Sequence, residues 1–418
     1  MEFDVKKISD PTFFEENRMA AHSDHICYQT KEEAQLEKSG LRYPLDGVWK
    51  FHYARNYTMT IPGFEKEDYN CRPWDDIRVP AHIQMEGYDA PQYANVQYPW
   101  DGREEIWTDQ VPEEFNPVAS YVKYVILPED FIKKGIYISF QGVESGFALW
   151  VNGSYVGYSE DSFTPSEFDL TPYWKDGENK IAVQVFKWTS SSWCEDQDFF
   201  RFSGIFRSVY LYTMAEVHVY DLKIEPLLSD DYKTGFLELA MKIRGEGKAK
   251  LTLKKDENVI FAEEIAVKEG DNQFRREVSA PVLWSAEIPE LYQLEIELSK
   301  DGADTVEWVE QKAGFRRFEM KDGIMCLNGK RIVFKGVNRH EFSSKTGRVV
   351  HREEVIKDIV TMKQNNINAI RTCHYPDDSI LYGLCDEYGM YLIAENNLES
   401  HGSWDVYLRG KVEKDKIV

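Results

Sequence analysis

The chain has 418 residues, with 50 lysines and arginines against 72 aspartates and glutamates, which gives a formal net charge of −22. At roughly 150 residues per domain, this length predicts two or three domains whose cores are large enough to fold without disulfides or a structural metal. The acidic balance argues against nucleic acid or an anionic membrane surface as the main partner.

The N-terminal residues and the spacing of the cysteines indicate the cellular compartment in which the protein is expected. The first residues, MEFDVKKISD, are polar and lack the apolar segment of a secretion signal. No run of about 18 apolar residues occurs that would span a membrane. The 6 cysteines lie far apart and form no C-x2-C pair, which excludes a zinc ribbon and argues against a disulfide framework. We therefore expect a soluble cytoplasmic protein with reduced thiols.

Residues 1–40 are polar and charged, and we expect them to form an arm that packs against a larger body. Residues 41–215 contain short alternating runs such as IYISFQGV, KIAVQVFKW and YLYTMAEV, separated by turn signals. Within GFALWVNGSYVGYSED, the pair Asn152-Gly153 separates two such runs, and Asn-Gly is the strongest two-residue hairpin signal. No long helical period interrupts this segment, so an all-β jelly roll or sandwich is predicted.

Tryptophan is concentrated in this first part of the chain. Eight of the 11 tryptophans fall before residue 194. Strands of a large sandwich favour aromatic side chains, which is the simpler interpretation. A surface on which flat, partly apolar sugar rings stack is the alternative, and composition alone favours the sandwich.

Residues 216–316 repeat the β pattern on a smaller scale. Runs such as GFLELAMKIRG, KAKLTLKKD and YQLEIELS indicate six or seven strands in about 100 residues, which suits an immunoglobulin-like sandwich. The Cys…Trp…Cys hallmark is absent, so only the architecture is predicted. The lysine-rich run 248–255 adjoins acidic residues, and we interpret it as a strand rather than a binding patch.

From residue 317 the pattern changes to alternating strands and helices. The hairpin signal Asn328-Gly329 precedes the apolar run RIVFKGV, and REEVIKDIVTMKQNN has apolar residues at helical spacing. NAIRTC is predicted to be a second strand and MYLIAEN a third. Between them, residues 377–379 can cap a helix, DSILYGLCDEYG, that ends at Gly389. The apolar strands predict a parallel sheet covered on both faces.

Residues 317–418 are predicted to be the start of a (β/α)8 barrel. No G-x-G-x-x-G follows the first strand, which disfavours a dinucleotide-binding sheet. A full barrel needs roughly 250 residues, whereas about 100 remain here and supply three strands. An open three-stranded piece would expose apolar faces and strand edges. The pattern therefore predicts a fragment of a longer protein.

Polar side chains cluster where these three strands end, and such strand ends carry the chemistry of barrels. They are Asn338, Arg339 and His340 after the first strand, Arg371 and His374 at the end of the second, and Glu395, Asn396, Asn397, Glu399 and His401 after the third. Neutral imidazoles at His340 and His374 can hydrogen-bond a hydroxyl or support a developing charge. A histidine at the rim of a core fits either position equally well. Arg371 can also be a structural ion-pair partner.

Glu399 and His401 are two residues apart, so in an extended segment they point the same way and can share a cation such as Mg²⁺. A solvated loop is the alternative. Retaining glycoside hydrolysis needs two carboxylates about 5 Å apart. Glu395 and Glu399 are the candidates at the strand ends. Because both lie on one short segment, they are poorly placed to face each other across a sugar ring. A weaker hypothesis makes Glu395, Glu399, His401 and His374 a complete metal hydrolase site.

Two polar residues of the first predicted domain lie in loop-like stretches between aromatics. They are Asn95 in YANVQYP and Asp161 in SEDSFTPSEFDL. An amide and a carboxylate beside stacked rings suit sugar hydroxyls. Asn and Asp also form turns for purely structural reasons, and the residue types alone favour that interpretation.

Several stretches together resemble the β-galactosidases of glycoside hydrolase family 2. They are PAHIQMEGYDAPQYANVQYPW, SGFALWVNGSYVGYSEDSFTPSEFDL, EDQDFFRFSGIFRSVYL, LWSAEIPELY, FKGVNRHEF and MKQNNINAIRTCHYPDDSILYGLCDEYGMYLIAENNLESHG. They run from about residue 40 to 402, and N-x-I-R-T-C-H-Y-P followed by D-x-x-G is a family signature. The first-domain segments differ from those of the family's glucuronidases and mannosidases. The ending ENNLESHGSWDV is most similar to the evolved-β-galactosidase branch.

The resemblance implies a fold and an activity. The fold is an N-terminal arm (1–40), a sugar-binding jelly roll (41–215), an immunoglobulin-like sandwich (216–316) and the first part of a TIM barrel (317–418). The activity is retaining hydrolysis of terminal β-D-galactosides such as lactose through a covalent galactosyl intermediate. By motif, Asn95 and Asp161 would reach into the galactose site, and Asp161 would also bind Na⁺. His340 and His374 would contact the sugar or stabilise the transition state.

By the same resemblance, Arg371 would order the carboxylates, and Glu399 and His401 would bind Mg²⁺. The family's acid/base glutamate, which is the third Mg²⁺ ligand, and its nucleophile glutamate follow these motifs. Neither motif occurs before Val418, so we expect this chain to be inactive alone, with an incomplete Mg²⁺ site. Family members are often tetramers with the arm at subunit contacts, so a homo-oligomer is expected for the full-length protein.

Two functions remain open from the sequence. The first is the N-terminal portion of a β-galactosidase that acts on a β-galactoside. The second is a non-catalytic carbohydrate-binding or scaffold protein whose barrel is completed by a partner chain. Neither requires nucleic acid or a membrane.

Overall fold

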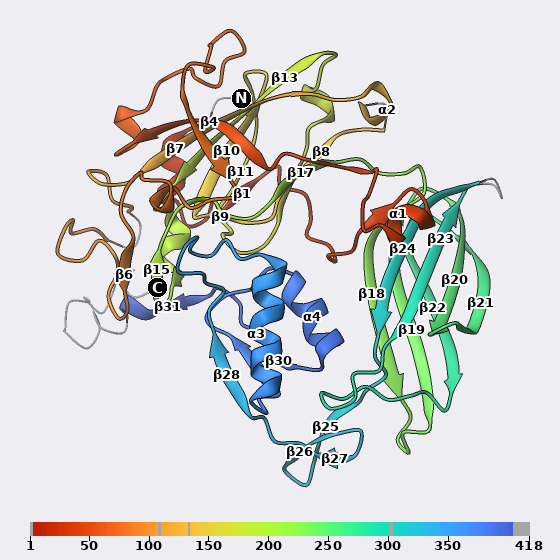
Figure 1. The fold of residues 1–418 in the computed structure, drawn as a ribbon. Helices are drawn as coiled ribbons and strands as arrows, with labels where there is room; N and C mark the ends of the chain where they lie inside the picture. Colours follow the sequence, from red (N-terminus) through yellow and green to blue (C-terminus); the bar gives the residue numbers. More distant parts are fainter. Residues whose placement is uncertain (1–2, 108–109, 133, 301–303, 404–418) are drawn as a thin grey trace.

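The computed structural model describes residues 3–107, 110–132, 134–300 and 304–403. Figure 1 shows a jelly roll drawn in red to yellow-green, a separate sandwich in green to cyan and a small α/β piece in blue. The α/β piece contacts both other parts, through Arg207 and Glu341 on the jelly-roll side and through Trp284 and Asp386 on the sandwich side. Within the described ranges, no helix has the length and apolarity needed to cross a bilayer.

The jelly roll is built from two antiparallel sheets. The larger has the strand order β1-β11-β10-β13-β7-β4-β5 and the smaller β12-β8-β17-β3. The elements of this domain are β3 (Arg42–Pro44), β4 (Gly47–Ala54), η2 (Tyr57–Met59), β5 (Asp75–Val79), η3 (Ile83–Met85), β6 (Gln92–Ala94), β7 (Val118–Ile126), α2 (Glu129–Ile132), β8 (Tyr137–Phe140), β9 (Val143–Glu144), β10 (Gly146–Val151), β11 (Ser154–Ser159), β12 (Ser166–Asp169), η4 (Thr171–Tyr173), β13 (Glu178–Phe186), η5 (Ser190–Trp193), β14 (Glu195–Asp196), β15 (Phe199–Arg201), β16 (Gly204–Ile205) and β17 (Val209–Tyr212).

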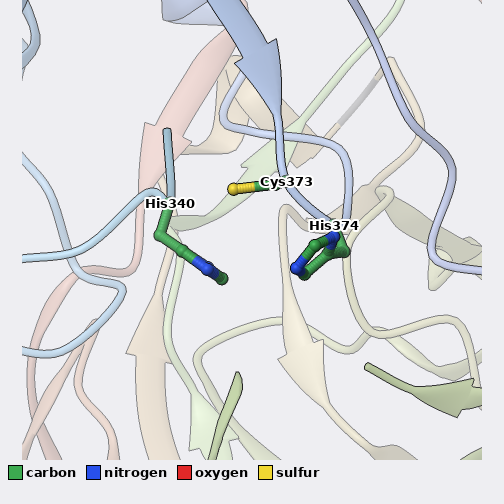
Figure 2. A group of neighbouring side chains, drawn as sticks. All are labelled: His340, Cys373 and His374. Atoms are coloured by element: carbon green, nitrogen blue, oxygen red, sulfur yellow. The ribbon is translucent and has the colours of Figure 1, made fainter. Parts of the chain in front are cut away.

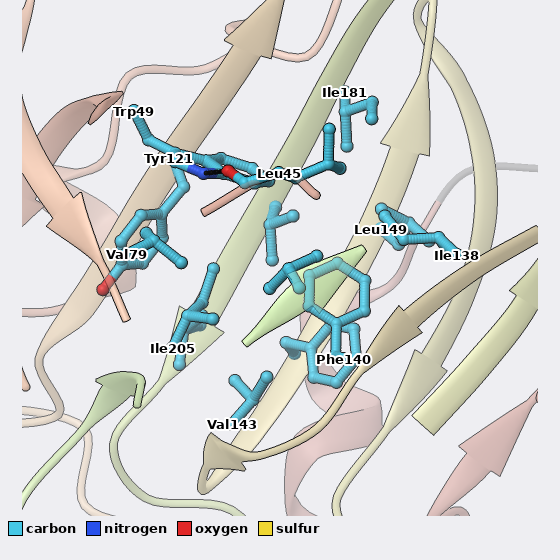
Figure 3. Close-up of a cluster of buried hydrophobic side chains, with 14 of the residues drawn as sticks. Leu45, Trp49, Val79, Tyr121, Ile138, Phe140, Val143, Leu149, Ile181 and Ile205 are labelled. Carbon is cyan, nitrogen blue, oxygen red and sulfur yellow. Dashed lines mark hydrogen bonds between the residues drawn. The ribbon is translucent and has the colours of Figure 1, made fainter. Parts of the chain in front are cut away.

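The jelly-roll core lies between the two sheets. Because successive strand residues face opposite sides, each strand sends every second side chain inward. Leu149 of β10, Ile181 of β13 and Ile138 of β8 meet in this core, as Figure 3 shows. Burying each such side chain contributes roughly 1.5–3 kcal/mol. The core sets the positions of the loops that lead toward the α/β piece.

The predicted hairpin and the simpler interpretation of the tryptophans are both found. Asn152 and Gly153 take φ values of 51° and 81° and join β10 to β11, which is the turn that Asn-Gly favours. Four of the early tryptophans are buried, whereas Trp107 is 52% exposed. The buried ones are Trp49, Trp100, Trp150 and Trp188. Half of the eight early tryptophans therefore lie in the packed interior, in agreement with the simpler interpretation.

The N-terminal arm packs on two domains, as expected. After η1 (Val5–Ser9), β1 (Glu15–Glu16) pairs with β11 of the jelly roll. Further along, β2 (Cys27–Tyr28) pairs with β24 of the sandwich. The short helix α1 (Lys31–Gln35) follows and lies beside β24 in Figure 1. The arm therefore links the jelly roll to the sandwich.

The sandwich has the sheets β18-β19-β22 and β2-β24-β23-β20-β21. Its strands are β18 (His218–Leu228), β19 (Thr234–Arg244), β20 (Gly247–Lys255), β21 (Asn258–Val267), β22 (Gly270–Ser279), β23 (Tyr292–Ser299) and β24 (Thr305–Ala313). The lysine-rich run is strand β20, and its lysines pair with glutamates of neighbouring strands, such as Lys250 with Glu297 and Lys254 with Glu295. This pairing confirms the interpretation of the run as a strand.

The α/β piece contains a parallel sheet, β28-β29-β30, after an antiparallel one, β25-β26-β27. Its elements are β25 (Phe318–Lys321), β26 (Ile324–Leu327), β27 (Lys330–Arg331), β28 (Gly336–Arg339), α3 (Arg352–Gln364), β29 (Ala369–Thr372), α4 (Ile380–Tyr388), β30 (Tyr391–Ile393) and β31 (Glu399–Ser400). Asn328 and Gly329 form the predicted hairpin turn, with φ values of 50° and 75°. The predicted β-α-β-α-β order is confirmed.

Two details of this piece differ from the sequence prediction. The first parallel strand is GVNR rather than RIVFKGV, so Asn338 and Arg339 lie inside β28 and Arg371 inside β29. Helices α3 and α4 share one apolar cluster with Ile370 of β29, on one face of the sheet. On the described chain, Val333 and Ile393 remain 54% and 51% exposed. Cover on both faces is therefore not found within the described residues, in line with the exposed apolar face that the sequence predicts for an open three-stranded piece.

Candidate functional site

The carboxyl ends of β28 and β29 bring two histidines together. His340 and His374 have ring centroids 5.3 Å apart, with the rings at 81°. Figure 2 shows the two imidazoles pointing toward one another, with the sulfur of Cys373 nearby. Nitrogens of both rings and the Cys373 sulfur lie within 4.8 Å of one another. The parallel pairing of β28 with β29 explains this meeting, because it aligns the strand ends.

Arg371 fixes the next carboxylate along the sheet edge. Its Nε and Nη2 donate to the two carboxylate oxygens of Glu395 at 2.5 and 2.9 Å. Its Nη2 also lies 3.4 Å from Nδ1 of His374. The interpretation of Arg371 as an ion-pair partner is correct, and the same contact orders one carboxylate beside a histidine. A bidentate pair of this kind is among the strongest side-chain hydrogen bonds.

The arrangement sets the protonation of the two imidazoles. A guanidinium only donates hydrogen bonds, so Nδ1 of His374 accepts from Arg371, and Nε2 carries the ring proton. The side chain of His340 is exposed, but partial desolvation and the neighbouring His374 and Arg348 lower its pKa. Two imidazoles in this position suit hydrogen bonds to hydroxyl groups. The nearby Arg371 cation weighs against a metal ion at His340, Cys373 and His374.

Asp161 lies in a jelly-roll loop that is tied to the loop after β30. The carboxylate of Glu195 accepts from the Ser162 amide at 3.1 Å and from the Asn397 side chain at 2.6 Å. One oxygen of Asp161 accepts from the hydroxyl of Thr164. The other, Oδ1, is buried and has no hydrogen-bond partner among the described residues. An unpartnered buried carboxylate oxygen fits a bound cation.

Glu399 and His401 lie together at the edge of the jelly roll. Strand β31 pairs in parallel with β14, and Oε1 of Glu399 lies 4.0 Å from Nδ1 of His401. That nitrogen is buried without a hydrogen-bond partner in the part of the chain that the structure describes. Asp196 accepts from the Gly402 amide at 2.6 Å, and burial raises the pKa of Asp196 to about 6. The two predicted ligands lie close to one another, and their binding of one cation stays a prediction.

Asn95 is exposed and directly follows β6. Strand β6 pairs with β15, and Arg201 of β15 donates to the Ala94 carbonyl at 3.4 Å and to Asp196 at 2.5 Å. Asn95 therefore lies on a loop whose backbone is held to the segment that carries Asp196. Its role in binding a sugar stays a prediction, as do the roles of Asp161 and of the strand-end histidines.

The weaker hypothesis of a complete metal hydrolase site does not fit this geometry. Glu395 is engaged by the Arg371 guanidinium through both oxygens, so it is not a free ligand. Sequence reasoning also missed Glu195, Asp196 and Arg201 as individual residues. Their signal was the alternation of acidic and aromatic residues in EDQDFFRF, but no spacing rule connects that run to residues two hundred positions later.

Comparison with known protein families identifies the family that has this architecture. Residues 43–215 match the model described as "Glycosyl hydrolases family 2, sugar binding domain", residues 217–316 match "Glycosyl hydrolases family 2", and residues 318–415 match "Glycosyl hydrolases family 2, TIM barrel domain". The chain belongs to glycosyl hydrolase family 2. The predicted fold class, a jelly roll, an immunoglobulin-like sandwich and the first part of a TIM barrel, is confirmed.

Within the family, the chain is similar to β-galactosidases. It is 49% identical to a β-galactosidase of Halalkalibacterium halodurans over 98% of this chain and 41% of that protein. It is 39% identical to a "Beta-galactosidase large subunit" of Lactobacillus acidophilus, with coverage of 97% and 67%. The chain thus spans less than half the length of the first of these relatives.

The structural comparison gives the same architecture. A β-glucuronidase of Bifidobacterium dentium superposes with a TM-score of 0.71 at 20% identity, over 86% of this chain and 62% of that one. A β-glycosidase of Bacteroides vulgatus superposes with a TM-score of 0.71 at 23% identity, over 89% and 47%. At these identities the likeness shows the fold alone.

Proposed function

We propose that the chain supplies the sugar-binding domains and the first barrel strands of a retaining β-galactosidase that hydrolyses terminal β-D-galactosides such as lactose. The observation that carries the proposal is the strand-end cluster, in which Arg371 holds Glu395 and His374 beside a second imidazole at His340. The similarity to proteins named β-galactosidase supports the choice of galactoside over other sugars.

In this proposal the chain's residues bind and orient the sugar. Nε2–H of His374 donates to a sugar hydroxyl, and the ring of His340 takes a second one. Asn95 and Asp161 reach the same galactose from the jelly roll. Arg371 holds the carboxylate of Glu395 in one position, which fixes the rim of the barrel in one arrangement.

The two carboxylates of the bond-breaking step come from sequence outside the 418 residues or from a second subunit. Retaining hydrolysis needs them about 5 Å apart, and Glu395 is neutralised by Arg371. The relatives named as a large subunit support completion by a partner. The chain alone is then inactive. We also propose that the complete protein is a cytoplasmic homo-oligomer, namely a tetramer.

Two cations belong to the same proposal. Glu399 and His401 would hold Mg²⁺ together with a further carboxylate, and the buried unpartnered nitrogen of His401 supports this. Asp161 would hold Na⁺ through its unpartnered oxygen. When bound, such cations supply positive charge beside the acid carboxylate and the sugar hydroxyls.

Complementation tests the proposal. The purified chain is mixed with the C-terminal portion of the Halalkalibacterium halodurans relative, beginning after the matched segment, and hydrolysis of a nitrophenyl β-galactoside is measured. We expect turnover in the mixture and none from either part alone. Asp161→Ala should abolish it, whereas Arg72→Ala, at an exposed ion pair, should not.

Other outcomes decide against the proposal. A mixture that forms a stable complex on a sizing column but cleaves no galactoside contradicts it. Galactose binding by the chain alone, seen by calorimetry and lost in Asp161→Ala, combined with no turnover in that complex, would favour the carbohydrate-binding alternative.

A further inference from the structure

The arm and both sheets of the sandwich meet at a group of ligand-type side chains that is separate from the strand-end site. Cys27 comes from β2 of the arm, His218 from β18 and Glu307 from β24, so both sheets of the sandwich contribute. The sulfur of Cys27 lies 3.8 Å from Nδ1 of His218, and that nitrogen lies 2.7 Å from Oε2 of Glu307. The three donor atoms all lie within 4.8 Å of one another.

The charge balance of this group favours a cation. Glu307 is 0% exposed, and its ion-pair partner is the single imidazole of His218. A thiol lies beside this pair, and burial together with Glu307 raises the pKa of Cys27, so without a metal the thiol keeps its proton. A divalent cation bound to one thiolate and one carboxylate forms an electrically neutral set. Neutrality removes most of the cost of burying the charges.

The distances suit zinc. Zinc binds sulfur at about 2.3 Å and nitrogen or oxygen at about 2.0–2.2 Å, so tetrahedral ligands place sulfur and nitrogen about 3.6 Å apart. The Cys27 to His218 distance of 3.8 Å already fits this value. The His218 to Glu307 contact of 2.7 Å must open by roughly 0.7 Å, because a metal replaces the shared proton. The Val219 amide donates to Oε1 of Glu307 at 2.9 Å, so the movement would fall on Oε2 and the His218 ring while that hydrogen bond is kept.

A cavity next to the group can supply the fourth ligand. It has a volume of about 40 Å³ and is lined by residues that include Cys27, His218 and Thr213. This volume holds a water molecule, which needs roughly 10–15 Å³. Thr213 is 3% exposed, and its hydroxyl has no hydrogen-bond partner among the described residues. A metal-bound water in the cavity would give that hydroxyl a partner.

The other histidines of the cavity are already engaged. Nε2 of His25 donates to the Val219 carbonyl at 2.8 Å, and Nδ1 accepts from Ser23. His22 lies between the Ser23 carbonyl and Glu167, at 2.9 Å from each. Neither ring has a free nitrogen, so the protein ligands number three. We propose that Cys27, His218 and Glu307 bind one Zn²⁺, with water from the cavity in the fourth position.

This site would fasten the arm to the sandwich. Zinc binding releases the thiol proton of Cys27 to solvent, and the ring proton of His218 moves from Nδ1 to Nε2. The metal then joins β2 to both sheets, through bonds that the β2 to β24 pairing of two residues does not supply. The inference is independent of the proposed galactosidase activity, because none of these residues contacts the strand-end cluster.

The test uses the purified chain and the metals themselves. After incubation with Zn²⁺ and passage over a chelating resin, elemental analysis should find one tightly held zinc per chain. With Co²⁺ in place of zinc, a thiolate-to-cobalt absorption band should appear in the near ultraviolet. The proposed Mg²⁺ site at Glu399 and His401 contains no sulfur and cannot give that band.

Matched variants assign the ligands. Cys27→Ser should lose the band and weaken zinc binding by at least about tenfold, whereas Cys194→Ser, at an exposed cysteine, should keep both. Glu307→Gln should weaken binding while it keeps the sulfur band, which provides a second readout if Cys27→Ser folds poorly. A wild-type chain that retains no zinc, or a band that survives Cys27→Ser, would overturn the proposal.

Discussion

Arg207 of the jelly roll and Glu341 of the α/β piece form a buried ion pair, with Nη2 2.8 Å from Oε2. The same nitrogen donates to the Pro376 carbonyl at 2.8 Å, and Nη1 donates to the Phe163 carbonyl at 2.7 Å. The other oxygen of Glu341 accepts from the Asp378 amide at 2.8 Å. One guanidinium therefore holds the loops after β28 and β29 against the jelly roll.

Loss of this guanidinium should be costly. In Arg207→Met the carboxylate of Glu341 stays buried without its partner, and we expect the free energy of unfolding to fall by about 3–5 kcal/mol. Arg72→Met removes an exposed ion pair with Glu178 and should cost less than about 1 kcal/mol. Urea denaturation of both variants checks this. Equal losses would show that the buried pair does not stabilise the domain contact.

A buried neutral histidine lies at the same domain contact. His82 is 0% exposed and stacks on Phe202 and Phe206, with ring centroids 4.3 and 5.1 Å away. Its Nε2 accepts from the Arg348 amide at 3.1 Å, so the ring cannot be protonated there. Burial and the charges of Arg348 and Arg207 hold the pKa of His82 well below its ordinary value of 6.5.

This histidine should make stability depend on pH. Because the pKa is depressed in the folded state, the contribution of His82 is full above pH 6.5 and is lost as pH falls, by about 1.4 kcal/mol per pH unit. The loss continues as the pH falls toward the lowered pKa of the folded ring. His82→Gln keeps an acceptor oxygen but does not titrate. In this variant the pH-dependent loss of stability that comes from His82 should disappear.

Urea denaturation at pH 8 and pH 5 separates packing from titration. The difference between wild type and His82→Gln at pH 8 measures the packing cost alone. The change in that difference at pH 5 measures the proton effect. A difference that stays constant between the two pH values would contradict a neutral buried ring.

Two glycines of one helix should respond oppositely to the same substitution. Gly389 ends α4 with φ of 76°, and a Cβ there would lie 2.3 Å from the Ala286 carbonyl of the sandwich. Gly389→Ala should destabilise the chain by roughly 1–3 kcal/mol. Gly383 lies within α4, where an added Cβ meets nothing within 4 Å, so Gly383→Ala should stabilise by up to about 1 kcal/mol. Thermal unfolding distinguishes the two, and a shared direction would contradict the assignment of the helix end.

Local chemistry explains what the sequence could predict of the fold. The turns at Asn152-Gly153 and Asn328-Gly329 need positive φ values, and their residue types supply them within two positions. The position of β28 depends instead on which residues meet β29. The apolar run before it was therefore misleading, because Val333 is not buried by its neighbours. Apolarity predicts burial only where a partner surface is present.

The residues of the candidate site also fall into two sets, those that the sequence alone could group and those that only domain packing brings together. Glu399 and His401 could be grouped from the sequence, because two residues of an extended segment point the same way. The link from Glu195 to Asn397 joins residues 202 positions apart, and packing of the jelly roll against the barrel strands decides it. The same is true of the group formed by Cys27 and His218, which the arm and the sandwich assemble.

The pair of Arg371 and Glu395 gives the last prediction, in which stability and turnover should respond differently. The two side chains are 34% and 27% exposed, so Arg371→Met should cost no more than about 1 kcal/mol of stability. In the complemented enzyme it should lower kcat for a nitrophenyl galactoside by at least about tenfold, because Glu395 and His374 lose the group that fixes them. Arg316→Met, which removes an exposed pair with Asp386, should leave both quantities unchanged. A large loss of stability with unchanged kcat would make Arg371 a purely structural residue.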